Sequence, residues 1–254
     1  METPASTPAS VPPRARRAGG HRCGRRYSCY DAVNTQDRPP VATPGEYQHL
    51  TMIEIDTHAL IGKGLHRECY VHPDDPARCV KVVVAGTIDE NHREAAYYGQ
   101  LAQRGISWEM LPRFHGLEQT TLGEGAIFDL VRDHDGPVSH TLAHYLVSRQ
   151  LTEQHAAALQ TALANLKGYL LENRIITMTL KPKNILFQQY TADDGRLVIV
   201  DNIGNSDFIP LANHSKWLAQ WKIKRKWRRF EHDLRSAYRN NPAVGKLLGH
   251  HGPA

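Results

Sequence analysis

Apolar residues follow a strand-like pattern in the middle of the chain. Residues 78–85 form a run rich in β-branched side chains, with one charged residue, Lys81, inside it. Such a run predicts a buried strand. Shorter apolar runs at residues 69–71 and 126–131 predict two further strands. Residues 88–104 lie between these runs and have a helical pattern that stops at a glycine. This part of the sequence is therefore expected to form a small sheet with one helix.

The pattern then becomes helical. Leucines at spacings of four, three and four predict a helix that Thr152 caps, and Ser139 is expected to cap a shorter helix before it. These leucines are Leu159, Leu163, Leu166 and Leu170. Two short strands at residues 185–187 and 197–200 interrupt the helices, and a turn at residues 194–195 joins them.

This order of elements predicts an α+β protein with two lobes. A polar stretch separates an N-lobe at about residues 51–132 from a C-lobe at about residues 137–238, within a domain of residues 51–254. Residues 1–50 are rich in Pro, Ala and Arg without hydrophobic periodicity, so a disordered tail is expected. The arginines fit a nucleic-acid-binding arm, and an uninvolved tail that precedes a start at Met52 fits as well.

Composition narrows the class of protein. The net charge is only +5, and the chain lacks the run of about eighteen apolar residues that a membrane-spanning helix needs. The N-terminus also lacks the apolar core of a secretory signal. The four cysteines include no Cys-x-x-Cys pair, so a zinc site is not expected, and their small number suits a reducing compartment. We therefore expect a cytoplasmic protein.

Lys81 is the first candidate for chemistry. Burial of an ammonium group inside a strand costs free energy unless a carboxylate pairs with it. Glu90 and Glu94 both lie on the next predicted helix, and Glu94 is the better partner because it shares a helical stripe with apolar residues. A lysine that reaches water from an edge strand is the alternative.

A glycine turn precedes this strand by one hairpin. Gly62 and Gly64 flank Lys63, and glycines allow backbone N–H groups to approach phosphate oxygens closely. The pattern is weak by itself, since most Gly-x-Gly sequences are simple turns. Its position one hairpin before Lys81 favours a role in phosphate binding.

The stretch at residues 180–186 carries the strongest signal. Lys181, a proline and Asn184 come just before a predicted strand, and Asp201 ends the following one. The amide oxygen of Asn184 and the carboxylate of Asp201 are hard ligands that suit magnesium held together with phosphates. Lys181 would neutralise charge on a phosphate during transfer. Turn capping explains either Asn184 or Asp201 alone, but explains both in this order poorly.

These residues resemble the protein-kinase-like superfamily and, more narrowly, the YrbL family of PhoP-regulatory-network proteins. The stretches that match the family are residues 62–70, 97–98, 177–186, 201–204, 209–211 and 215–217. The resemblance implies that Lys81 contacts the nucleotide phosphates and that Glu94 holds it. It also implies that Lys181 and Asn184 end a catalytic loop and that Asp201 binds magnesium. The family name implies a bacterial regulatory role and gives no substrate.

The sequence departs from active kinases at the catalytic base. The aspartate of that loop is replaced by Thr179, which cannot act as a carboxylate base; Asp207 lies close enough in sequence to be a displaced one. General-base catalysis contributes about 10²–10⁴-fold, so its loss slows transfer without removing the metal ligands. Arg67 replaces the third glycine of the loop and brings a cation toward the phosphates. Few residues follow Gly204, which favours a small-molecule acceptor over a protein.

A basic segment with interleaved tryptophans ends the C-lobe. Residues 216–229 contain seven Lys or Arg and no acid. A helical face is shared by Ile223, Trp227, Phe230, Leu234 and Tyr238, which favours a helix packed on the core. The cations also fit an anionic lipid surface or a nucleic acid.

The sequence therefore predicts a kinase-like protein that binds ATP and Mg²⁺, with adenine near residues 129–133. It is expected to be either a slow or atypical phosphotransferase or a nucleotide-sensing pseudokinase. The alternative is a basic regulatory protein that binds nucleic acid or an anionic membrane without catalysis.

Overall fold

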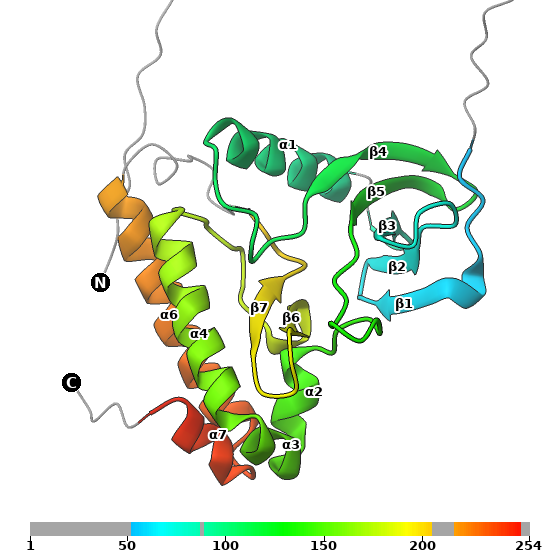
Figure 1. Ribbon diagram of the computed structural model, residues 1–254. Coiled ribbons are helices and arrows are strands. Elements are labelled where there is room, and N and C mark those ends of the chain that lie inside the picture. The colour runs from blue at the N-terminus through cyan, green and yellow to red at the C-terminus, as the bar shows by residue number, and fades with distance from the viewer. Residues whose placement is uncertain (1–51, 87–88, 205–215, 250–254) are drawn as a thin grey trace, which may run out of the picture. The chain divides into compact units, whose positions relative to one another are not determined.

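The computed structural model describes residues 52–86, 89–204 and 216–249 (Figure 1). They belong to a compact unit that spans His49–Ala254. The predicted tail and Asp207 lie outside the described residues. The domain and lobe boundaries given above stay predictions.

Five antiparallel strands form the N-terminal sheet, in the spatial order β1-β2-β3-β5-β4. Their bounds are Leu60–Lys63 for β1, Arg67–Val71 for β2, Arg78–Val83 for β3, Phe114–Thr120 for β4 and Gly123–Asp129 for β5. The short 3-10 helix η1, Thr57–Ala59, precedes β1. Helix α1, Asp89–Gln103, contacts β4 and β5 (Figure 1).

Alternation along β3 divides its side chains between two environments. Val80 and Val82 are buried together with Tyr70 and Ile127 in a small cluster on one face of the sheet. Lys81 therefore points to the opposite face, as the period of two in a strand requires. Because Lys81 pairs with Cys69 on β2 and with Ala126 on β5, it occupies the middle of the sheet.

The remainder of the described chain is mostly helical. Its helices are α2 at Leu142–Val147, α3 at Arg149–Gln154, α4 at Ala156–Glu172, α6 at Lys216–Ala237 and α7 at Pro242–Leu247. The short 3-10 helix η2, Pro182–Asn184, leads into the hairpin of β6, Ile185–Gln189, and β7, Gly195–Ile199. Helix α4 contacts both β7 and α6 (Figure 1).

Two predicted helix caps are wrong. Ser139 does not cap α2; its hydroxyl donates to the carboxylate of Asp133 at 2.6 Å, and Thr141 caps the helix instead. Thr152 does not cap α4, because it lies inside α3 and donates to two backbone carbonyls. Helix α4 begins after His155. Hydroxyl residues near a helix start can serve either as caps or as bonds to the preceding turn, and the sequence does not separate the two uses.

The C-terminal helix α6 packs its apolar face on the core, as predicted. Ile223, Trp227, Phe230 and Leu234 are buried there. Helix α7 lies beyond residue 238 and adds Val244 and Leu247 to the same core. In the part of the chain that the structure describes, no helix is long and apolar enough to cross a membrane.

The order of elements confirms the predicted class. A five-stranded sheet with a helix between β3 and β4 comes first, and helices with a small β-hairpin follow. The protein is therefore α+β, as predicted. The minimal two-lobed protein-kinase-like fold, with a small N-lobe sheet plus helix and a truncated helical C-lobe, is what the resemblance implies for this order. Strand β4 was missed in the sequence, because its burial pattern mixes exposed and half-buried positions.

Candidate functional site

Lys81 is buried in the face of the sheet that carries the site. Its ammonium donates to the backbone carbonyl of Val200 at 2.5 Å and lies 4.0 Å from the ring centroid of Phe128. A buried ammonium needs such partners to offset the loss of water. The alternative of a lysine that reaches solvent from an edge strand is thus excluded.

Glu94 provides the carboxylate that faces Lys81. It projects from α1, its side chain is 5% exposed, and its Oε1 lies 3.9 Å from Lys81 Nζ. The rival candidate, Glu90, lies one turn earlier and is only half-buried. The structure therefore brings together the lysine and the glutamate that the sequence paired.

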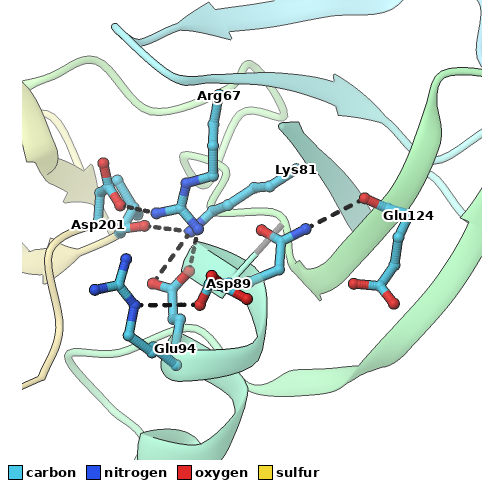
Figure 2. A network of polar contacts seen from close by, with 9 residues as sticks. Arg67, Lys81, Asp89, Glu94, Glu124 and Asp201 are labelled. Carbon is cyan, nitrogen blue, oxygen red and sulfur yellow. Dashed lines mark hydrogen bonds and ion pairs between the residues drawn. The ribbon is translucent and has the colours of Figure 1, made fainter. Parts of the chain in front are cut away.

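Arg67 is the residue at this site whose contacts the sequence did not reveal. Figure 2 shows its guanidinium between two carboxylates: Nη1 donates to Glu94 and Nη2 donates to Asp201. Burial would lower the pKa of Arg67, but attraction to these carboxylates outweighs burial and raises it. Arg67 therefore remains a cation that joins β2, α1 and the segment after β7. An arginine at the third position of the glycine turn signalled a cation, but not its partners.

The glycine turn sets the position of Arg67. The backbone N–H of Gly64 donates to the carbonyl of Arg67 at 2.7 Å, which closes the turn between β1 and β2. A Cβ atom at Gly64 would lie 3.2 Å from that same carbonyl, so a side chain there would crowd the turn. Gly62 is less constrained, since a Cβ there would lie 3.8 Å from Cys69. Their role in contacting phosphate stays a prediction.

Asp201 follows β7, and backbone hydrogen bonds of the residues just after it hold its segment in place. Attraction to Lys81 and Arg67 lowers its pKa, although burial acts in the opposite direction and is the largest single influence. Asn202 has a φ of 62°, a left-handed conformation that asparagine tolerates well. Its carbonyl accepts from the N–H of Met178 at 2.8 Å, while Gly204 donates to Ile176 at 3.0 Å. These bonds fix the segment of Asp201 against the loop that leads to Lys181.

Asn184 lies beside this segment. The N–H of Val200 donates to its backbone carbonyl at 3.0 Å, and its own N–H closes η2 on the carbonyl of Lys181 at 2.9 Å. Asn184 is buried, whereas the side chain of Lys181 is exposed. The amide and carboxylate oxygens of Asn184 and Asp201 fit magnesium chemically. One oxygen of Asp201 is already bonded to Arg67, however.

Thr179, at the position where the sequence predicts that a catalytic base is missing, is exposed. The loop around it is tied to helix α6, because Lys226 donates to the carbonyl of Met178 at 2.5 Å. Within the described ranges, no three His, Cys, Asp or Glu side chains gather as a metal-binding group.

Two thiols continue the same face of the sheet toward the predicted adenine site. Cys69 pairs with Lys81 across β2 and β3, and Cys79 lies two residues before Lys81. The thiol of Cys79 lies 3.8 Å from the carbonyl of Asp129, at the start of the segment expected to bind adenine.

The comparison with protein families settles the kinship of the chain. Residues 53–235 match the family described as PhoP regulatory network protein YrbL. The chain belongs to the YrbL family. It is 41% identical over 182 residues to the uncharacterized protein YrbL of Escherichia coli (strain K12), a match that covers 70% of this chain and 86% of the relative. The YrbL protein of Shigella flexneri matches to the same extent.

A solved structure also aligns with this YrbL-family chain. It is a chain in the structure of the CAK complex from Chaetomium thermophilum bound to ATP-gamma-S. The match has 16% sequence identity and a TM-score of 0.42, and covers 56% of this chain. The chain spans 44% of the length of that protein.

Proposed function

We propose that this YrbL-family protein binds ATP at the site formed by Arg67, Lys81, Glu94 and Asp201. The observation that carries the proposal is the Lys81–Glu94 ion pair of 3.9 Å beside Asp201, inside a kinase-like order of elements. In this proposal Lys81 contacts the α and β phosphates, Glu94 holds Lys81, and Gly62 and Gly64 cover the phosphates. The base lies between the two thiols and residues 129–133.

If a divalent ion such as magnesium binds at this site, Asn184 and Asp201 are the residues that would hold it. A divalent ion held there would neutralise phosphate charge. For Asp201 to give both oxygens to a metal, Arg67 must release the oxygen that it now contacts. Lys181 is exposed at the start of η2, where it can turn toward a phosphate without breaking a buried contact.

Binding of ATP does not by itself mean that its phosphate is transferred. Thr179 cannot accept a proton as a carboxylate does, which leaves a slow or atypical phosphotransferase or a nucleotide sensor. The family description supports a regulatory role. If transfer occurs, the acceptor proposed is a small molecule.

Thermal unfolding with ATP, in the presence and absence of Mg²⁺, tests the proposal. ATP should stabilise the wild-type protein, because a ligand that binds only the folded state raises its melting temperature. Asp201→Ala should change that stabilisation when Mg²⁺ is present. Asp193→Ala is the matched control, since Asp193 is exposed in the β6–β7 turn. Equal melting of the wild type with and without ATP, under both conditions, would refute nucleotide binding. Labelled phosphate that appears in a second product would establish transfer.

A second candidate function rests on the exposed face of α6. Trp217 and Trp221 are 70% and 48% exposed, and the guanidinium of Arg225 lies 4.8 Å from the ring centroid of Trp221. Lys224 and Arg228 are exposed on the same helix. We propose that this face binds an anionic partner, because cations attract it and exposed indoles add contact area.

Binding to vesicles or to a single-stranded oligonucleotide at several salt concentrations tests this candidate. Binding should weaken steeply as salt increases, and a variant with Lys224, Arg225 and Arg228 changed to Gln should lose it. Vesicles of phosphatidylglycerol, compared with phosphatidylcholine, separate a lipid partner from a nucleic acid. The absence of binding to either probe at low salt would rule the candidate out.

A further inference from the structure

The four charged groups at the candidate site balance one another. Arg67 and Lys81 are cations, Glu94 and Asp201 are carboxylates, and the contacts described above join all four (Figure 2). The side chain of Arg67 is 14% exposed and that of Asp201 is 37% exposed, so water screens this cluster only partly. The site is therefore neutral before any ligand arrives.

Arg67 contacts Asp201, the carboxylate that would hold a divalent cation. A metal at a nucleotide site bridges a carboxylate to phosphate oxygens and neutralises the charge of both. A guanidinium can do the same, because it carries five N–H donors in a planar fork. The contacts with Glu94 and Asp201 engage one donor on each terminal nitrogen. The remaining donors can bind phosphate while Asp201 stays attached.

The same arrangement opposes a metal ion. A divalent cation at Asp201 would meet the charges of both Arg67 and Lys81, whose ammonium bonds to the residue just before Asp201. Like charges close to one another repel strongly where water is partly excluded. Arg67 cannot move far while its backbone carbonyl closes the β1–β2 turn, so only its side chain can withdraw.

We propose that Arg67 takes the place of the bridging divalent cation, so that this site binds a nucleoside triphosphate without a metal. This inference rests on the proposed ATP binding and specifies how that binding depends on metal. The triphosphate bridges Arg67 and Lys81, while Glu94 and Asp201 keep both cations oriented. Mg²⁺ then adds little to affinity, and Arg67 becomes the residue that sets metal dependence.

Calorimetric titration with ATP, in EDTA and in Mg²⁺, tests the inference. The wild-type dissociation constant should differ by less than about tenfold between the two conditions. Arg67→Met should weaken binding in EDTA by about ten- to a hundredfold, the range expected when charge-assisted hydrogen bonds are lost. Mg²⁺ should restore much of this loss, because it can then reach Asp201. Arg149→Met is the control, since Arg149 forms an exposed ion pair with Glu153 on α3.

Two further measurements keep the test decisive. Arg67→Lys retains the charge without the fork, so it should bind ATP in EDTA with intermediate affinity even if Arg67→Met folds poorly. Without nucleotide, Mn²⁺ followed by electron paramagnetic resonance should bind Arg67→Met more tightly than the wild type. Wild-type binding that requires Mg²⁺, with Arg67→Met unchanged, would overturn the inference and leave ATP binding intact. No ATP binding by any variant in either condition would overturn the proposed function itself.

Discussion

The guanidinium of Arg67 donates a hydrogen bond to the carboxylate of Asp201, although 134 residues separate them in the sequence. The bond connects the first hairpin of the N-terminal sheet to the segment that follows β7. Because Arg67 also contacts Glu94 on α1, one side chain links three elements. The contact is therefore both a structural tie and a part of the candidate site.

This tie should be measurable as a coupling free energy. We expect a double-mutant cycle of Arg67→Met and Asp201→Asn to give about 0.5–3 kcal/mol, the range found for residues in one ion-pair network. Chemical denaturation of the four proteins provides the measurement. The exposed pair of Arg149 and Glu153 is the reference, with an expected coupling of about 0.3–0.5 kcal/mol. A coupling near zero for Arg67 and Asp201 would mean that the contact is not formed in solution.

The stability of the protein should also depend on pH through Asp201. The pKa of this carboxyl in the folded state lies below its ordinary value of 3.8, so its charged form is favoured by folding. Its contribution is then fully present above the unfolded pKa and is lost as pH falls through the folded pKa. The free energy of unfolding should therefore differ most between wild type and Asp201→Asn near neutral pH. That difference should shrink below about pH 4. A difference that stays constant down to pH 3 would contradict the assignment.

The sequence predicted much of the site because its chemistry is local. Lys81 is recognisable as one charge inside a β-branched strand, and burial then requires a carboxylate on a neighbouring element. Glu94 was chosen as that carboxylate because it shares a helical stripe with apolar residues. Asp201 and Asn184 follow from their positions beside short apolar strands. Their roles toward ATP and Mg²⁺ stay predictions.

The contacts of Arg67 could not be predicted in the same way. Two carboxylates share its guanidinium, and their separation in the sequence from Arg67 is 27 residues for one and 134 for the other. Such long-range partners depend on how the loop after β7 meets the sheet, which periodicity does not encode. Strand β4 was missed for a different reason, its mixed pattern of exposure. The cap predicted at Thr152 is wrong because its hydroxyl donates back to the carbonyls of Tyr145 in α2 and of Ser148.

The two environments of α6 should separate in a stability measurement. Trp227 is buried and donates to Glu231 at 2.6 Å, whereas Trp221 is 48% exposed. Trp227→Ala should lower the free energy of unfolding by about 3–5 kcal/mol, because it leaves a cavity in the core. Trp221→Ala should change it by only about 0.5 kcal/mol, as surface substitutions usually do. Urea denaturation measures both. Equal effects would mean that the helix does not pack with Trp227 inward.

An aspartate at the base position should raise any phosphate transfer that this protein performs. Thr179 is exposed in the loop before Lys181, so Thr179→Asp is expected to fold normally. A positioned base contributes about 10²–10⁴-fold, so transfer of labelled phosphate should increase toward that range. Thr191→Asp is the control, since Thr191 is exposed in the β6–β7 turn. If Thr179→Asp leaves a measurable transfer rate unchanged, Thr179 does not occupy the base position.

Cys69 should report directly on where the nucleotide base binds. Interaction with the neighbouring thiol of Cys79 lowers the pKa of Cys69; Lys81 and Arg67 act in the same direction, against the effect of burial. Because the thiolate is the reactive form, a maleimide should label Cys69 faster than Cys79, whose pKa is raised. Mass spectrometry can follow both sites after Cys23 and Cys29 are changed to Ser. Saturating ATP should slow labelling of Cys69 severalfold, whereas inorganic phosphate should not, because only ATP carries a base that covers the sulfur. Unchanged labelling at an ATP concentration that raises the melting temperature would place the base elsewhere.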